Sequence, residues 1–425
     1  MSYHIDTLCV QAGYQPKSGK SRTVPIIQST TFKYDTSEQM GRLFDLEEAG
    51  YFYTRLQNPT NDLVAAKLCA LEGGAAAMLT SSGQAATFYS LFNICGTGDH
   101  IISSSAIYGG TYNLLSITMK RMGIECSFIH PDAPIEEFEA AFTPRTKAIF
   151  AESLANPAMV VLDFEKFASL AQRHGVPFIV DNTFPTPVNC RPFEFGADII
   201  VHSTTKYLDG HGTTVGGAIV DSGSFDWNAH AEAYPGLTEP DESYHGVIYT
   251  ERFGKAAFIT KATVQLMRDL GSIPSPANSF YLNMHMESLA LRMERHCSNA
   301  LTVAEYLLEH PKVSWVKYPG LPSDEHYKLA QRYMPKGTCG VVSFGVSGGR
   351  DKVGAFTDSL RLISIATHVA DTRTCVLYPA GTTHRQMSDI ELEAAGVKPD
   401  LIRLSCGIED PSDIIADLEQ ALAGI

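Results

Sequence analysis

Short apolar segments recur about every 25 residues between residues 75 and 221, and this spacing constrains the fold more than any other feature. The segments read "AAMLTS", "HIISSS", "ECSFIH", "TKAIFAES", "PFIVDN", "DIIVHST" and "GGAIVD", and helical patterns lie between them. The clearest pattern, "DFEKFASLAQRHG", puts four apolar residues on one face and a terminating glycine after them: Phe164, Phe167, Ala168, Ala171 and Gly175. Alternating strands and helices predict an α/β fold with a mostly parallel sheet that helices cover on both faces.

The segments before and after this block differ in composition and in predicted secondary structure. Residues 1–60 are irregular and rich in Tyr, Thr, Gln and Pro, so we expect an arm that has no core of its own and packs against another part of the molecule. After the block, two helical stretches at roughly 253–270 and 284–309 are separated by "GSIPSPANSF". Patterns in "GTCGVVSFGV", "RDKVGAFTDSLRLI" and "DLIRLSCGIE" then predict a smaller α+β domain. We therefore expect an arm at 1–60, a cofactor-binding domain at 61–255 and a C-terminal domain at 256–425.

The composition restricts the class of partner. The 425 residues carry a net charge of -14, whereas nucleic acids and anionic membranes attract clustered positive charge, so we expect a small-molecule ligand. The start "MSYHIDTLCV" has no basic region before a long apolar stretch, and no apolar run approaches bilayer-spanning length, which predicts a cytoplasmic protein. The 9 cysteines include no C-x-x-C pair and indicate neither a disulfide framework nor a zinc ribbon.

Polar residues follow the predicted strands in succession. In open parallel sheets ligands bind beyond the carboxyl ends of the strands, so the residue types at those ends indicate whether a binding site is present. One polar strand end alone is commonly a helix cap or a turn, but a succession of them favours a binding site. The residues are Ser82 and Gly83, Ser103 to Ser105 with Tyr108, Glu152 with Asn156, Asp181, and Ser203 with Thr205 and Lys206.

The residue types at these ends narrow the ligand. "TSSGQAAT" places Gly83 at a strand-to-helix junction, where free backbone N–H groups and the helix dipole bind phosphate. Lys206 can be one more phosphate counter-charge, or, as a desolvated lysine with a lowered pKa, it can form a Schiff base with an aldehyde. Asp181 ends the buried run "FIV" and can cap a helix or pair with a protonated pyridine nitrogen. A phosphate cradle, an amine and a carboxylate together predict pyridoxal 5'-phosphate (PLP).

With "VDNTF" followed by "HSTTKYLDGHG", the chain resembles the Cys/Met-metabolism family of PLP-dependent enzymes over nearly its whole length. The resemblance implies the aspartate-aminotransferase-like fold, PLP fold type I, and a homotetramer built of tight dimers. It also implies the residues that hold the cofactor. These are the Schiff-base lysine Lys206, the pyridine partner Asp181, the phosphate-binding hydroxyls of Ser203 and Thr205, the backbone donors Gly83 and Gln84, and the ring-stacking, proton-transferring Tyr108. Tyr53 and Arg55 in "YFYTRLQNPT" would reach the phosphate of a neighbouring subunit, which would explain the irregular arm.

The same resemblance implies which residues contact the substrate. Asn156 in "ESLANP" matches a contact near the cofactor O3', and Arg403 in "LIRLSCGIED" matches the group that binds the α-carboxylate. A planar guanidinium suits bidentate recognition of a carboxylate. Ser364 stands where the family has another carboxylate contact, although "ISIATHVADT" departs from the "SLGGxES" form of the lyases.

Three stretches indicate the reaction within the family. Gly110 in "YGGTY" stands where methionine γ-lyases have a cysteine, while residues 237–271 and 365–387, with Asp371, are similar to the O-acetylhomoserine sulfhydrylases. We therefore expect γ-replacement on O-acetyl-L-homoserine by sulfide or a small thiol, giving L-homocysteine or methionine and acetate. Lys206 would remove the α- and then the β-protons, with Tyr108 assisting. Methionine γ-lyase activity, which releases 2-oxobutyrate, ammonia and methanethiol, is the alternative.

Other interpretations use different residues. "GVSGG" at 345–349 fits the G-x-S-x-G pattern of a serine hydrolase with Ser347 as nucleophile, and Asp358 or Asp371 and then His384 follow in order. This alternative leaves the polar strand ends unexplained. A PLP-binding module without turnover would not need Tyr108 and Arg403 beside Lys206. The spacing of His202 and His211 does not place two ligands on one helix face, so no metal is expected.

Overall fold

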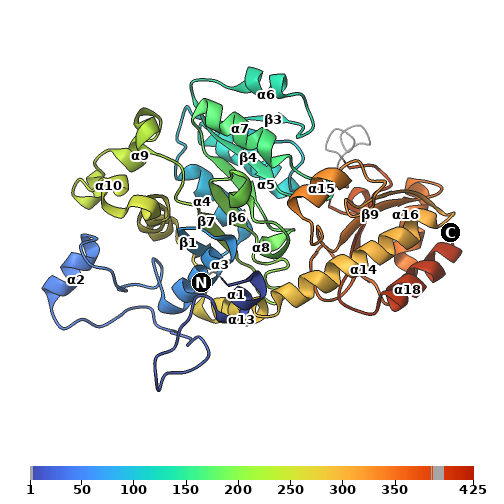
Figure 1. Ribbon diagram of the computed structural model, residues 1–425, viewed down its shortest axis with the longest axis horizontal. Helices are drawn as coiled ribbons and strands as arrows, with labels where there is room; N and C mark the ends of the chain where they lie inside the picture. Colours follow the sequence, from blue (N-terminus) through green and yellow to red (C-terminus); the bar gives the residue numbers. More distant parts are fainter. Residues whose placement is uncertain (1–2, 384, 386–396) are drawn as a thin grey trace.

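The computed structural model describes residues 3–383, 385 and 397–425, with the larger of two sheets at the centre of the molecule (Figure 1). Its strand order is β1-β7-β6-β5-β4-β2-β3. β7 runs antiparallel to both of its neighbours, and the other pairs are parallel, which confirms the predicted α/β fold. The strands are β1 (Ala76–Thr80), β2 (His100–Ser104), β3 (Glu125–Ile129), β4 (Thr146–Glu152), β5 (Phe178–Asp181), β6 (Ile199–His202) and β7 (Gly217–Asp221).

Both faces of this sheet are buried. In β5, Phe178 and Val180 join one hydrophobic cluster, whereas Ile179 between them joins a second cluster on the opposite face. Because neither face meets water, successive strand residues are apolar, as the uninterrupted apolar segments of the sequence indicate. Helices α3 (Pro59–Glu72), α7 (Phe164–His174) and α14 (Leu289–Glu309) contribute to the first cluster, and α4 (Gly83–Phe92) and α11 (Ala257–Lys261) contribute to the second.

Helix α7 shows how the local sequence sets an element. The Asp163 side chain accepts a hydrogen bond from the backbone N–H of Lys166 and thereby caps the first turn. Phe164 and Phe167 are fully buried against the sheet. Gly175 ends the helix with φ 63°, a left-handed conformation that costs a glycine little and most other residues considerably more. The predicted helix and its terminating glycine are therefore confirmed.

The smaller sheet lies toward the C-terminus (Figure 1) and has the order β10-β11-β12-β9-β8. Two of its strands and one helix fall where the sequence predicts them, at "GTCGVVSFGV", "DLIRLSCGIE" and "RDKVGAFTDSLRLI" respectively. The strands are β8 (Val313–Lys317), β9 (Val341–Val346), β10 (Ser364–Ile365), β11 (Cys375–Leu377) and β12 (Ile402–Ser405), and helices α16 (Arg350–Ser359) and α18 (Pro411–Ala423) pack on them with α14.

The helical stretches after the larger sheet differ in detail from the sequence pattern. The stretch predicted at 253–270 comprises the end of α10 (Tyr249–Phe253), the 3-10 helix η5 (Gly254–Ala256), α11, the π-helical turns η6 (Ala262–Met267) and α12 (Arg268–Leu270). Helix α13 (Pro276–Met286) begins inside "GSIPSPANSF", which the sequence analysis assigned to a break. Proline is compatible with the first turn of a helix, and the Ser275 hydroxyl accepts from the N–H of Asn278, so this proline starts the helix instead of interrupting it.

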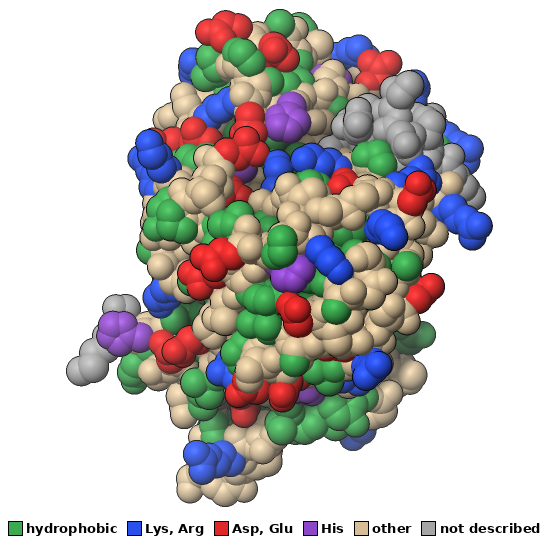
Figure 2. All heavy atoms as spheres, turned by 90° about the vertical axis from the view of Figure 1, so that its right-hand side faces the viewer, with side chains coloured by type: hydrophobic (Ala, Val, Ile, Leu, Met, Phe, Trp, Pro, Cys, Tyr) green, Lys and Arg blue, Asp and Glu red, His purple; other side chains and the backbone are tan. Residues whose placement is uncertain are grey.

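The N-terminal residues extend along the outside of the larger sheet. They contain α1 (Ile5–Gln11) and α2 (Ser37–Phe44), and Figure 1 shows α2 standing apart from the sheet. Figure 2 shows acidic and basic side chains interspersed over one face of the molecule. Among the described helices, none is long and apolar enough to cross a membrane.

Candidate active site

The carboxyl ends of three adjacent parallel strands bring the predicted site residues together. Glu152, the last residue of β4, pairs with Asp181, the last residue of β5, and Asp181 pairs with Val201 of β6. Ser203 and Lys206 follow β6 directly. Parallel strands end at the same edge of a sheet, so side chains far apart in the sequence meet there.

The start of helix α4 forms one wall of this site. A Cβ on Gly83 would lie 2.6 Å from the Cβ of Ser203, so only glycine lets the first turn of α4 approach Ser203 this closely. Ser82 caps the helix through the N–H of Ala85. The Thr205 hydroxyl accepts from the N–H of Gly216 at 3.1 Å. Free amide groups of a first helical turn beside hydroxyls are a suitable cradle for a phosphate.

Lys206 lies one turn after β6, where its backbone N–H donates to the carbonyl of Ser203 at 3.2 Å. Burial, and after it the positive charge of Arg403, lower the pKa of its amine to about 8. Removing an ammonium group from water disfavours its charged form. The amine is thus more reactive near neutral pH than an exposed lysine.

Asp181 is held in a turn made by the residues that follow it. Its Oδ1 accepts the backbone N–H of Thr183 at 2.9 Å and also the Thr183 hydroxyl. Burial raises the pKa of Asp181, while these hydrogen bonds and the charge of His202 act in the opposite direction. The hydroxyl of Thr183 also accepts the N–H of Ser203 at 2.8 Å, so it joins the predicted pyridine partner to the predicted phosphate site. Thr183 is a site residue that the sequence patterns did not indicate.

Arg403 and Asn156 come together from the two sheets. Arg403 Nη1 donates to Asn156 Oδ1 at 3.3 Å, and Nη2 donates to the carbonyls of Thr367 and His368 at 3.3 and 3.1 Å. Burial lowers the pKa of Arg403. Its Nε is a buried donor that has no partner among the described residues. A buried unsatisfied donor on a guanidinium is suited to an incoming carboxylate.

Ser364 makes no contact with Arg403 among the described residues, although its strand partner Cys375 interacts electrostatically with both Lys206 and Arg403. Ser364 is an exposed residue of the edge strand β10, and its backbone N–H donates to the carbonyl of Thr374. The carbonyls of Thr367 and His368 occupy positions next to the guanidinium.

Tyr108 precedes the short helix α5 (Gly109–Asn113) and is 52% exposed. A Cβ on Gly110 would lie 2.5 Å from Cε1 of the Tyr108 ring and 3.1 Å from Nε2 of Gln84. The ring therefore rests on the backbone of Gly110, which explains why this position tolerates no side chain without a shift. The N–H of Tyr108 donates to Glu152 Oε1 at 2.6 Å.

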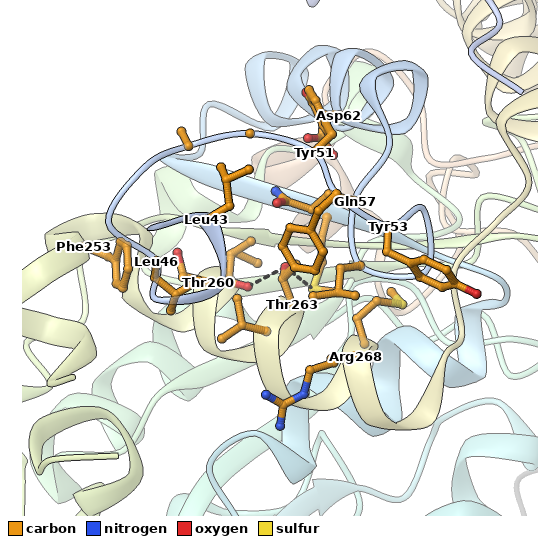
Figure 3. A pocket seen from close by; sticks show the side chains of 18 of the residues that line it. Leu43, Leu46, Tyr51, Tyr53, Gln57, Asp62, Phe253, Thr260, Thr263 and Arg268 are labelled. Atoms are coloured by element: carbon orange, nitrogen blue, oxygen red, sulfur yellow. Dashed lines mark hydrogen bonds between the residues drawn. The ribbon is translucent and has the colours of Figure 1, made fainter. Parts of the chain in front are cut away.

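Tyr53 and Arg55 are separate from these residues within one chain. Both line a cavity of about 1430 Å³ between the N-terminal residues and the π-helical turns, and Figure 3 shows Tyr53 beside Gln57 at this cavity. The Arg55 guanidinium lies 5.3 Å from the centre of the Tyr53 ring and donates to the carbonyl of Arg268. Among the described residues, neither Lys206 nor Asp181 lines the cavity.

A buried polar network lies directly behind the strand ends and was missed by the sequence analysis. Glu72 Oε1, at the end of α3, lies 2.6 Å from Nε2 of His202 and accepts from Nδ2 of Asn182 at 2.9 Å. The Ser153 hydroxyl donates to Asn182 Oδ1 at 2.8 Å. Ser153, Asn182 and His202 each stand next in sequence to a site residue. His202, a polar residue within an apolar segment, is the one signal of this network in the sequence.

The serine-hydrolase residues do not converge in the structure. Ser347 lies between β9 and α16, and its backbone N–H donates to the carbonyl of Lys312. Asp371 Oδ2 is paired with Arg373 at 2.8 Å. No contact between described residues joins Ser347 to Asp358 or Asp371, and His384 lies outside the described residues.

The residues of the strand ends fit PLP. Gly83 and Ser203 are packed tightly, which places the first turn of α4 beside the Ser203 hydroxyl, a combination suited to a phosphate. Asp181 is a half-buried carboxyl group suited to a protonated ring nitrogen, and Lys206 is a half-buried amine suited to an aldehyde. The unpartnered Nε of Arg403 is suited to the carboxylate of an amino acid.

Comparisons with known proteins agree with this chemistry. The sequence profile of the family described as Cys/Met metabolism PLP-dependent enzyme matches residues 6–423. The chain is 46% identical to the homocysteine/cysteine synthase of Saccharomyces cerevisiae over 99% of this chain and 98% of that protein. It is 44% identical to the O-acetyl-L-homoserine sulfhydrylase of Leptospira meyeri over 100% of this chain and 98% of that protein. A Campylobacter jejuni structure described as an O-acetylhomoserine (thiol)-lyase, with a pyridoxyl-lysine phosphate, superposes with a TM-score of 0.95 at 37% identity over 99% of this chain and 100% of that chain.

Proposed function

Because the chain belongs to the family of Cys/Met metabolism PLP-dependent enzymes, we propose that it exchanges the acetate of O-acetyl-L-homoserine for sulfide or a small thiol. The products are acetate and L-homocysteine, or methionine when the thiol is methanethiol. The observation that carries this assignment is the similarity, over nearly the full length of the chain, to relatives named homocysteine synthase and O-acetyl-L-homoserine sulfhydrylase. The strand-end site supports it with a half-buried amine, a half-buried carboxyl group and a buried arginine suited to a carboxylate.

PLP is the cofactor, and its holding residues are those of the carboxyl edge. When bound, PLP supplies an aldehyde that condenses with amines and an electron-poor ring that withdraws charge from the substrate. Ser203, Thr205 and the backbone N–H groups of Gly83 and Gln84 hold the phosphate in this proposal. Asp181 keeps the ring nitrogen protonated, since a buried carboxylate favours a positive partner. Tyr108 covers the ring from the start of α5.

Lys206 is the base of the reaction in this proposal. Its Nζ takes the proton from the α-carbon of the substrate, releases that proton, and as a neutral amine again takes a proton from the β-carbon. A pKa lowered to about 8 by burial suits this work, because a base is most effective when its pKa is near the operating pH. The Tyr108 hydroxyl assists as a second proton carrier.

Arg403 and Asn156 orient the substrate. Arg403 receives the α-carboxylate, and its hydrogen bonds to the carbonyls of Thr367 and His368 keep the guanidinium in place when no carboxylate is present. The side-chain amide of Asn156 lies near the cofactor O3' in this proposal and orients that side of the site. Ser364, which is exposed on the edge strand β10, is kept in this proposal as a second contact of the α-carboxylate, on its match to the family's position alone.

The N-terminal arm completes the site of a neighbouring subunit in this proposal. Tyr53 and Arg55 would reach the neighbour's phosphate, which accounts for an arginine that faces a large cavity away from its own chain's Lys206. The assembly would be a homotetramer made of two such dimers.

We place the arm at 1–60, the PLP-binding domain at 61–255 and the C-terminal domain at 256–425. The helices of 257–270 pack on the larger sheet, so the core of the C-terminal domain is formed by the residues that follow these helices.

A comparison of three substrate sets tests the reaction. The measurement is kcat/KM for O-acetylhomoserine with sulfide, for O-succinylhomoserine with cysteine, and for methionine alone. We expect homocysteine synthesis from the first set to exceed the other two rates. Dominant breakdown of methionine to 2-oxobutyrate, ammonia and methanethiol, with negligible homocysteine synthesis, would replace this proposal with a methionine γ-lyase. Lys206→Ala is the control, since it removes the amine that each of these reactions needs.

A further inference from the structure

Glu152 is tied to three residues of the candidate active site, although it has no assigned role there. Its Oε1 accepts the backbone N–H of Tyr108 at 2.6 Å, 44 positions away in the chain. The backbone N–H of Asn156 also hydrogen-bonds to its carboxyl. Through the pairing of β4 with β5, Glu152 lies directly beside Asp181. One side chain thus connects the predicted stacking tyrosine, the predicted O3' contact and the predicted pyridine partner.

The environment of Glu152 disfavours a second negative charge. The residue is 8% exposed, and burial raises its pKa well above the ordinary value, with the charge of Asp181 acting in the same direction. Two carboxyls that share a buried site do not both ionise readily. Asp181 accepts two hydrogen bonds from Thr183 and feels the charge of His202, all of which favour its ionised form. Glu152 also accepts the backbone N–H groups of Tyr108 and Asn156, and these lower its pKa but do not offset burial and the charge of Asp181. To accept from Tyr108, the Glu152 oxygen needs to be in this position and does not need a charge.

We propose that Glu152 is a positioning residue that fixes Tyr108 and the Asn156 loop beside Asp181 through the shape of its carboxyl rather than through its charge. The backbone hydrogen bond from Tyr108 sets where α5 begins and hence where the tyrosine ring lies. A displacement of about 1 Å at such a ring can lower a rate by about 100-fold. This inference rests on the proposed function for its activity readout, but the position of the ring can be measured without any substrate.

Two substitutions separate shape from charge. Glu152→Gln keeps the length and the oxygen that accepts from Tyr108, and it removes the charge. Glu152→Asp keeps the ionisable carboxyl but shortens the side chain by one carbon, so that it no longer reaches the Tyr108 N–H. Glu125→Gln is the matched control, because Glu125 is a strand glutamate whose side chain is 60% exposed.

The first readout is the visible circular dichroism of the PLP-loaded protein, which depends on how the ring is held and not on which substrate is turned over. We expect Glu152→Gln and Glu125→Gln to keep the wild-type band and Glu152→Asp to lose much of it. The second readout is kcat, which should stay within about threefold of wild type for Gln and fall about 10- to 100-fold for Asp.

The reverse order, with Gln impaired and Asp normal, would show that the charge is what matters and would overturn the proposal. Equal behaviour of both variants and wild type would overturn it as well. Equal impairment of Gln and Asp, with unchanged urea unfolding midpoints, would also contradict a role through shape. If all proteins failed to synthesise homocysteine while the dichroism followed the expected order, the proposed reaction would fall and the positioning role would stand.

Discussion

Arg403 Nη1 and Asn156 Oδ1 lie 3.3 Å apart, and this hydrogen bond joins β12 of the smaller sheet to the loop after β4 of the larger sheet. The two residues are 247 positions apart in the chain. The place where we expect the substrate carboxylate is therefore built by both sheets. Its geometry depends on how the two sheets are held against each other.

Arg403→Lys tests the carboxylate site. A lysine ammonium cannot reproduce the planar fork that binds a carboxylate through two parallel hydrogen bonds, and it is shorter in reach to Asn156. We expect KM for O-acetylhomoserine to rise about 10- to 100-fold, equivalent to about 1.4–2.7 kcal/mol. The KM for sulfide, which carries no carboxylate, should change little. An unchanged KM for the amino acid would remove Arg403 from the substrate site.

The reactivity of Lys206 should follow its lowered pKa. Only the neutral amine attacks an aldehyde, so below pH 8 most Lys206 side chains are protonated and inactive, and above pH 8 most are reactive. We expect the rate at which the apoenzyme takes up PLP to rise with pH and to level off with a midpoint near 8. Stopped-flow absorbance measures this rate, and Lys206→Ala should give no adduct that borohydride reduces. A midpoint near the ordinary lysine pKa would contradict the burial of the amine.

Gly110→Ala should displace the Tyr108 ring. The new Cβ would lie 2.5 Å from Cε1 of that ring, which is closer than real carbon contacts permit, so the ring or the loop must move. We expect kcat to fall about tenfold with little change in the urea unfolding midpoint. Gly41→Ala in α2 is the control, because nothing lies within 4 Å of its Cβ position. Equal kcat for both variants would show that the ring position is not needed for turnover.

Hybrid assemblies test the shared site. Lys206→Ala and Arg55→Ala subunits should each be inactive alone, but a mixed dimer contains one site with both wild-type residues. Random mixing in equal amounts should restore about a quarter of the wild-type activity, since half of the dimers are hybrids with one working site. Activity after unfolding and refolding the mixture is the measurement. No recovery in hybrids demonstrated by mass spectrometry would place Arg55 outside the neighbour's site.

Glu72→Gln tests the buried network behind the site. The side chains of Glu72 and His202 are fully buried, and the partner atoms lie 2.6 Å apart. The amide nitrogen of the variant would stand where Oε2 of Glu72 is buried without a partner among the described residues, and an unsatisfied buried donor costs about 1–3 kcal/mol. We expect a large drop in the urea unfolding midpoint. Glu38→Gln, in an exposed pair with Arg42, should change stability by less than about 1 kcal/mol, and a similar effect of both variants would contradict the prediction.

The sequence by itself determined the parallel sheet and the chemistry at its carboxyl edge. Apolar segments of strand length alternate with amphipathic helices, and this pattern is local, because a strand residue is buried or exposed according to its neighbours a few positions away. Gly175 could be recognised as a helix end for the same reason. Asp181 and Lys206 could be predicted as neighbours because Asp181 ends β5 and Lys206 lies one turn after β6, and the ends of adjacent parallel strands lie at the same edge of the sheet.

Only the tertiary structure decided which distant residues touch. Glu72 and His202 are 130 positions apart, and nothing local to α3 indicates that its last carboxylate lies behind β6. Likewise, the hydrogen-bond partner of Glu152 is a backbone N–H, and residue type does not indicate which backbone N–H will be the donor. Ser364 is exposed because β10 is an edge strand. The physical reason is that strand order, helix packing and the approach of the smaller sheet depend on contacts summed over the whole chain, whereas a sequence pattern reports only the burial of each residue among its near neighbours.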